Sequence, residues 1–127
     1  MTTPAPISAE MLRFLDENVD SVDHLEVLRV LSEAPNQTLD LAEVVARAQT
    51  TPVLAMRLEQ RGLLRTEMIG ATAVCRFADV PPETESLLKQ LLQLYRERPV
   101  TLIKTVYARD RKDLKAFADA FRLRKEN

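Results

Sequence analysis

Residues 40–77, DLAEVVARAQTTPVLAMRLEQRGLLRTEMIGATAVCRF, contain the start and stop signals of two consecutive helices. Asp40, with Glu43 three residues later, is expected to form a capping box, which is typical of the first turn of a helix. Pro52 suits the first position of a second helix, where a missing amide hydrogen costs no bond. Gly62 suits its end, because glycine readily adopts the left-handed conformation that follows many helices. The stretch therefore predicts a helix, a tight turn and a second helix.

A hairpin is expected directly after these two helices. The segments Leu64–Ile69 and Thr72–Ala78 have a fair apolar alternation and are separated by Gly70, which suits a tight turn. A further short strand is expected at Asn36–Leu39, just before the first helix of the stretch.

The run Arg57–Leu64, RLEQRGLL, resembles the R-L-E-x-R-G-L-[LIV] signature of bacterial winged-helix regulators of the MarR, ArsR and PadR type. The resemblance implies a winged helix-turn-helix domain over about residues 21–80, roughly half of the chain. We therefore expect a mainly α fold with a small β hairpin. An N-terminal arm and short helix (1–20) would precede the winged domain, and C-terminal helices (81–127) that pair two chains would follow it.

The segments on either side of this domain have helical patterns. Residues 1–7 are rich in proline and are expected to form a loose arm. Ser8 suits the cap of a short helix that ends near Val19, and another amphipathic helix is expected from about Ser21 until Pro35 stops it.

The C-terminal third begins with a leucine-rich helix that starts at the two prolines before Glu83. Pro99 is expected to break or kink this helix. The apolar residues that follow it continue the stripe, and their β-branched composition leaves a strand as the alternative. A closing amphipathic helix with a basic rim is expected around the apolar positions Leu114, Phe117, Ala118 and Phe121.

Composition and charge describe one globular domain with an uneven charge distribution. The chain of 127 residues is 46% apolar and 29% charged, with a net charge of −1. Residues 1–50 hold nine acidic and three basic side chains, whereas residues 51–127 hold ten acidic and fifteen basic ones. An acidic first part and a basic second part suit self-association or an anionic partner, and a solvated surface of mixed charge explains them equally well.

The residue types that carry catalysis or metal binding are scarce. Cys75 and His24 are the only cysteine and histidine, so one copy cannot form a disulfide, a Cys/His zinc site or a Ser-His-Asp triad. Cys75 is expected in the core and His24 on the surface. We also find no glycine-rich nucleotide motif, no signal peptide and no apolar run of bilayer length. The sequence therefore predicts a cytoplasmic protein that is not an enzyme, does not bind a membrane and needs no cofactor or metal.

The resemblance directs attention to the outward face of the second helix and to the hairpin. Base reading and phosphate contact need polar and basic side chains. The candidate DNA contacts of this kind are Thr50, Arg57, Gln60, Arg65 and Arg76. Val53 and Met56 are also expected to face outward, and an apolar outward stripe suits a protein partner. Packing under the hairpin or at a dimer contact is the alternative for these two side chains.

The leucine-rich helix is expected to pair two chains. Its apolar positions cover nearly half of the circumference, which is more than a single winged domain is expected to bury. The candidate dimerisation residues are Leu87, Leu88, Leu91, Leu92, Leu94 and Tyr95. The sequence thus leaves two functional hypotheses: a homodimeric transcriptional regulator that binds double-stranded DNA, and a winged-helix module that docks another regulatory protein without reading DNA sequence.

Overall fold

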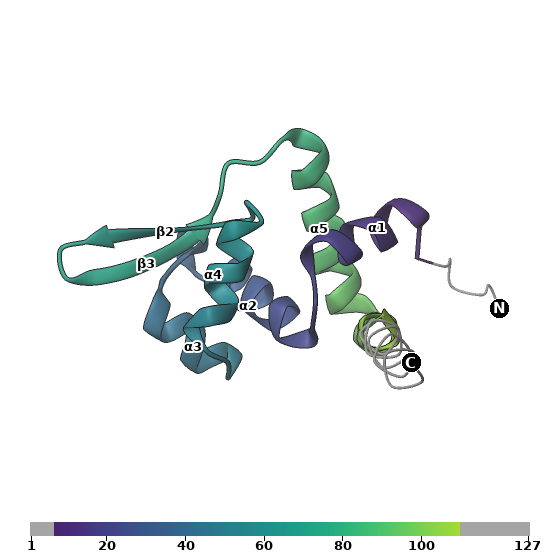
Figure 1. The fold of residues 1–127 in the computed structure, drawn as a ribbon, viewed down its shortest axis with the longest axis horizontal. Coiled ribbons are helices and arrows are strands. Elements are labelled where there is room, and N and C mark those ends of the chain that lie inside the picture. Colours follow the sequence, from purple (N-terminus) through teal and green to yellow (C-terminus); the bar gives the residue numbers. More distant parts are fainter. Residues whose placement is uncertain (1–6, 110–127) are drawn as a thin grey trace, which may run out of the picture.

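A computed structural model describes residues 7–109 of the chain (Figure 1). The elements in chain order are α1 (Ala9–Asn18), α2 (Val22–Glu33), the 3-10 turn η1 (Pro35–Gln37), β1 (Thr38–Asp40), α3 (Leu41–Ala48), α4 (Pro52–Gln60), β2 (Leu64–Ile69), β3 (Thr72–Phe77) and α5 (Pro82–Glu97). A further helix covers residues 99–109 and is called the 99–109 helix below. The described residues thus form a mainly helical fold with a small antiparallel sheet.

The sheet has three strands in the order β1-β3-β2, an arrangement compatible with a winged helix. Leu39 of β1 pairs with Cys75 of β3, and the hairpin closes at the pair Ile69 and Thr72. Of the two loop residues between them, only Gly70 has a positive φ, of 65°, as at the first central position of a type II′ turn. In Figure 1 the hairpin projects to the left of the helices.

Two strand boundaries differ from the sequence prediction. The short strand expected at Asn36–Leu39 lies at Thr38–Asp40, because Asn36 and Gln37 have positive φ values of 55° and 52° within η1. A left-handed backbone cannot continue a strand. The last strand ends at Phe77, one residue before the predicted end.

The predicted helix boundaries of the central stretch are confirmed, although one cap works differently. Pro52 is the first residue of α4, and Gly62 follows α4 with a φ of 82°. α3 begins directly after Asp40, but the Asp40 side chain makes no capping hydrogen bond. Glu43 accepts instead from Arg47 Nε at 3.1 Å, so the expected capping box is absent.

The core is built around α2. This helix contacts α3 and α4 on one side and α5 on another, and its buried residues are His24, Leu25, Val27, Leu28, Val30 and Leu31. The same core cluster continues from Met11 of α1 to Val106 of the 99–109 helix. The segments on both sides of the α2–β3 region therefore share one core with it.

The lone cysteine and histidine both lie in this core. Cys75 is fully buried, as expected, and burial raises the pKa of its thiol, which disfavours the reactive thiolate. The prediction of a surface position for His24 is wrong, because its side chain is fully buried. His24 Nδ1 lies 3.0 Å from Ser21 Oγ, and Nε2 has no hydrogen-bond partner among the described residues.

The break between α5 and the next helix falls at Pro99, which is the first residue of the 99–109 helix. α5 ends at Glu97, and the apolar segment after Pro99 is helical rather than extended, with Leu102 and Val106 buried. The Tyr95 hydroxyl of α5 donates to Glu26 of α2 at 3.0 Å and joins the two helices. The predicted N-terminal arm and closing amphipathic helix lie largely outside the described residues.

Candidate interaction surface on α4 and the hairpin

α4 divides sharply into an inner and an outer face. Ala55 and Leu58 are buried, which anchors the helix on the core. The side chains predicted to face outward are all exposed: Val53, Met56, Arg57 and Gln60. The sequence prediction of the outer face of α4 is therefore confirmed.

The outer face of α4 is apolar over its first two turns. Val53 is 52% exposed and Met56 is 54% exposed. Beside them, an open groove of about 550 Å³ runs between the start of α3 and the hairpin tip. Its lining residues are Asp40, Leu41, Ala42, Val45, Pro52, Ala71, Thr72 and Ala73. We call the surface formed by this groove together with Val53 and Met56 the α4–wing face.

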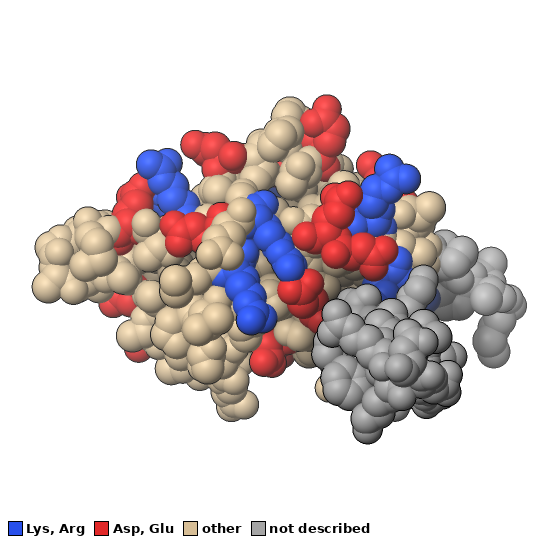
Figure 2. Space-filling model, in the orientation of Figure 1, with Lys and Arg blue, Asp and Glu red and all other residues tan. Residues whose placement is uncertain are grey.

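The hairpin tip extends the uncharged character of this region. Met68 and Ile69, the last residues of β2, are both exposed. Figure 2 shows the tip and much of the neighbouring surface over α3 without charged side chains, whereas Lys or Arg side chains lie over α4. Exposed apolar side chains that gather around a groove are typical of a surface that another protein covers.

The hydroxyl group of Thr50 is shielded from solvent. Its Oγ1 is buried and has no hydrogen-bond partner among the described residues. The residue lies in the α3–α4 turn, where the left-handed Gln49 (φ 53°) reverses the chain. Thr50 was a candidate DNA contact, and the burial of its hydroxyl oxygen argues against a hydrogen bond from this group to a base.

The two hairpin arginines share one carboxylate. Arg65 and Arg76 are cross-strand partners, and both are exposed. Glu67 Oε1 lies 3.2 Å from Arg65 Nε and 2.8 Å from Arg76 Nη2. A phosphate would have to compete with this carboxylate for both guanidinium groups. The sequence contained a signal for this pairing, because Arg65 and Glu67 are two residues apart and so share one face of a strand.

Arg57 and Gln60 remain open on α4. Both are exposed, and neither forms an ion pair or side-chain hydrogen bond within residues 7–109.

The net charge of the whole described part is unfavourable for DNA binding. Residues 7–109 contain 12 Lys and Arg and 15 Asp and Glu, so their net charge is 12 − 15 = −3. Because phosphate contact supplies much of the affinity for DNA, this balance favours weak DNA binding at most.

The leucine-rich helix does not present its apolar side to solvent. Leu88, Leu91 and Tyr95 of α5 are buried within one chain, and the other three candidate dimerisation residues, Leu87, Leu92 and Leu94, are half-buried against the same core. The excess of apolar surface that suggested dimerisation is covered by α1, α2 and the 99–109 helix. Dimerisation stays a prediction, but these six residues do not provide an exposed contact surface for it.

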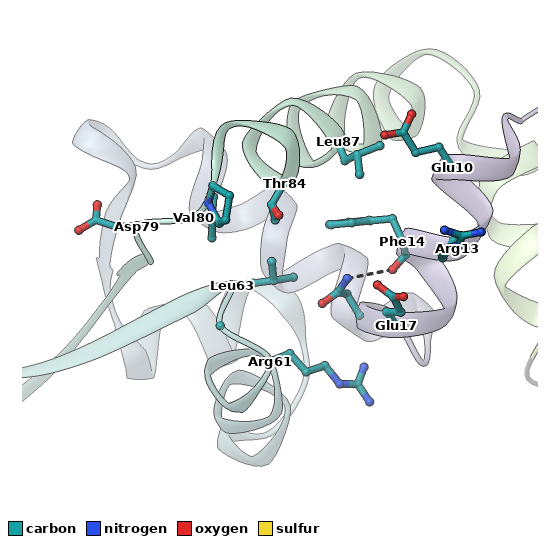
Figure 3. Close-up of a pocket in the computed structure, with 13 residues that line it drawn as sticks. Glu10, Arg13, Phe14, Glu17, Arg61, Leu63, Asp79, Val80, Thr84 and Leu87 are labelled. Carbon is teal, nitrogen blue, oxygen red and sulfur yellow. Dashed lines mark hydrogen bonds between the residues drawn. The ribbon is translucent and has the colours of Figure 1, made fainter.

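A second groove, of about 490 Å³, lies between α1, the end of α4 and the start of α5 (Figure 3). Phe14 points toward Thr84 and Leu87 inside it. Its charged lining residues are of both signs, Glu10, Arg13, Glu17, Arg61 and Asp79. Arg61 is already paired with Asp20 at 2.5 Å, so the groove offers no concentrated charge of one sign to a ligand.

Neither a metal site nor a membrane-spanning helix is found within residues 7–109. No three His, Cys, Asp or Glu side chains within residues 7–109 come together in a way that could hold a metal ion. None of the helices in that range combines the length and the apolar character needed to cross a bilayer. In comparisons with known proteins, no family model and no curated protein sequence matches the chain.

Proposed function

We propose that this chain is a protein-interaction module that docks another protein, without reading DNA sequence, through the α4–wing face. The observation that supports this proposal most directly is the pair Val53 and Met56. Both side chains are more than half exposed on the outer face of α4, which is the helix that a DNA-binding winged helix offers to the major groove. Base reading there needs hydrogen-bonding side chains, whereas docking of a protein needs apolar ones.

Val53 and Met56 would contribute part of the free energy of docking, as the apolar centre of an interface. Full burial of a Val or Met side chain stabilises by about 1.5–3 kcal/mol. Since Val53 and Met56 already have nearly half of their surface covered, each would contribute roughly 1 kcal/mol on docking. The adjoining groove adds Leu41, Val45 and Pro52 as walls for an apolar side chain of the partner.

The proposal is tested by identifying a partner that binds this face and measuring its affinity. A photo-crosslinking residue at position 53 should capture one defined protein in cells, and the same residue at position 47, on the polar side of α3, should not. The purified partner should then bind the full chain, and Met56→Glu should weaken binding by about tenfold to a hundredfold, because the new carboxylate is buried in an apolar contact.

Gln90→Glu is the matched control, because it adds the same charge to an exposed site on α5. It should leave the affinity for the partner unchanged. Equal affinity of the wild type and Met56→Glu would refute this assignment of the surface, provided that both proteins melt at the same temperature.

A dimeric DNA-binding transcriptional regulator is the second candidate. Arg57 and Gln60 support it, because they are exposed one turn apart on the outer face of α4 without side-chain partners in the described part. Two copies would have to place their α4 helices about 34 Å apart to enter successive major grooves.

This candidate predicts measurable binding to duplex DNA at low salt. Fluorescence anisotropy with a random-sequence duplex should show binding that decreases with salt and decreases again in Arg57→Ala. Loss of one phosphate contact should also reduce the salt dependence by about one unit of log-log slope. Absence of any binding at low salt would exclude DNA as the partner.

A further inference from the structure

The outer side of α4 changes from apolar to basic along its length. Val53 and Met56 come first, and the exposed Arg57 and Gln60 follow toward the C-terminal end. At 1.5 Å per residue, Arg57 stands about 6 Å further along the helix axis than Val53, and Gln60 stands about 10 Å further. Residues three and four apart lie on the same side of a helix, so these four side chains form one continuous surface, here called the outer strip.

The positive charge of the outer strip is not balanced by an acidic residue of the same helix. Glu59 is the one acidic residue of α4, and its Oε1 accepts the backbone N–H of Thr66 at 3.2 Å, which directs the carboxylate toward β2. The nearby carboxylate of Asp20 is bonded to Arg61 at 2.5 Å. That hydrogen bond is the largest cause of the lowered pKa of Asp20, and the charge of Arg57 is a minor one. Arg57 itself forms no ion pair within residues 7–109.

The groove beside the outer strip has the opposite charge at its far wall. Asp40 lines the groove together with the apolar Leu41, Val45 and Pro52, whereas Arg57 lies outside it. In Figure 2 the basic side chains over α4 lie beside the uncharged surface over α3 and the hairpin tip. A carboxylate of a bound molecule would be repelled by Asp40 and attracted by Arg57, so the favourable place for it is the C-terminal part of the outer strip.

We infer that the outer strip selects a partner segment in which an apolar side chain is followed, after a short fixed spacing, by an aspartate or glutamate. The apolar side chain would contact Val53 and Met56, and the carboxylate would pair with Arg57 and accept a hydrogen bond from the Gln60 amide. A separation of about 6 Å corresponds to about four residues in a helical partner or two in an extended one. This inference rests on the proposed docking function and adds the chemistry of the partner.

A protein carboxylate fits the outer strip better than a nucleic-acid backbone does. A duplex presents a continuous row of phosphates and needs many basic contacts, whereas the strip offers a single unpaired arginine next to apolar side chains. The net negative charge of residues 7–109 also repels a long polyanion. One carboxylate beside an apolar anchor avoids both difficulties.

Selection from a phage-displayed library of random peptides on the immobilised full chain tests this inference. Peptides that bind the wild type but not Met56→Glu are those that contact the α4–wing face. Among these peptides, Asp and Glu should be enriched over Lys and Arg at a fixed short spacing from an apolar residue.

The affinity of one selected peptide, made synthetically, then measures the contribution of the charge. Arg57→Glu should raise the Kd at least about tenfold, because it replaces an attraction by a repulsion. Gln60→Glu adds a negative charge with little change of shape and should raise the Kd roughly threefold to tenfold. Gln90→Glu, which makes the same change on α5, is the matched control and should have no effect.

Exchange of the two charges separates recognition from a loss of folding. A peptide in which the acidic residue is replaced by Lys should bind Arg57→Glu more tightly than it binds the wild type. An unfolded or distorted variant would bind neither peptide, so this reversal requires direct pairing of the two charges.

The failure of this inference can be told apart from the failure of the docking function. Met56-dependent peptides without enrichment of acidic residues, or an affinity that Arg57→Glu leaves unchanged, would overturn the inference and leave the docking function standing. Failure to recover any Met56-dependent peptide would count against the docking surface itself, and the inference would fall with it. Tighter binding of a random-sequence DNA duplex than of the selected peptides would assign Arg57 to phosphate contact and would also overturn the inference.

Discussion

The buried histidine should make the stability of this protein depend on pH in a defined window. Burial lowers the pKa of His24 below its ordinary value of 6.5, because the core disfavours the charged ring. The carboxylate of Asp20 opposes this effect, Arg61 and Arg57 add to it, and Asp23 opposes it again. The ring nitrogen Nε2 has no acceptor among the described residues, so a proton added there would be buried without a partner.

The sign and size of the effect follow from proton binding by the two states. Below pH 6.5 the unfolded chain takes up a proton at His24, whereas the folded chain takes it up only at lower pH, so the free energy of unfolding falls as pH falls. If the folded ring stays neutral, the loss between pH 6.5 and 5.5 is about 1 kcal/mol, with a limiting slope of about 1.4 kcal/mol per pH unit. Arg61 holds the pKa of Asp20 below its ordinary 3.8, so the loss due to Asp20 comes at lower pH.

Urea unfolding at a series of pH values measures this slope. His24→Gln should remove the slope between pH 6.5 and 5.5, whatever its effect on absolute stability, because the chain has no other histidine. Ser21→Ala is the control, since it removes the hydrogen-bond partner of Nδ1 but keeps the titrating ring. A flat wild-type profile, or an unchanged slope in His24→Gln, would show that the buried ring is not the source.

Three further predictions concern single side chains. Tyr95→Phe removes the hydrogen bond to Glu26 and should lower the free energy of unfolding in urea by about 1 kcal/mol. The control Tyr107→Phe changes an exposed tyrosine and should have no measurable effect. Equal effects would contradict the role of that bond. In Gly62→Ala the new Cβ meets no atom within 4 Å, but the residue must keep a φ of 82°. Thermal unfolding should therefore show a loss of stability of roughly 1 kcal/mol, which comes from the backbone alone. Glu67→Gln should change stability by less than about 0.5 kcal/mol. It should increase DNA binding at low salt, because it frees Arg65 and Arg76 from their shared carboxylate. No increase would argue against any DNA contact of the hairpin.

Much of the central fold was predictable from single residues. Pro52 and Gly62 marked the ends of α4 correctly, and Gly70 marked the hairpin turn, because each acts through the conformations of its own backbone. The outer face of α4 followed from three- and four-residue spacing, which is a property of any helix. Val53 and Met56 could therefore be placed on the surface before the structure was known.

The expected roles of other side chains depended on partners that are distant in sequence. The Thr50 hydroxyl is buried beneath a turn, and Arg76 is paired with a glutamate on the neighbouring strand. Neither fact follows from local spacing alone. The burial of His24 has the same origin, since a polar residue near a helix start is normally exposed, and only packing around α2 encloses it.

The sequence by itself determined where α3 and α4 begin, where the hairpin turns and which side of α4 is apolar, because these properties arise from backbone preferences and from periodicity. Only the tertiary structure decided which apolar sides are covered. It buried the leucines of α5 within one chain and left Val53, Met56, Val100 and Tyr107 exposed. The physical reason is that periodicity identifies an apolar side of a helix, whereas its burial depends on the surfaces that other segments bring against it.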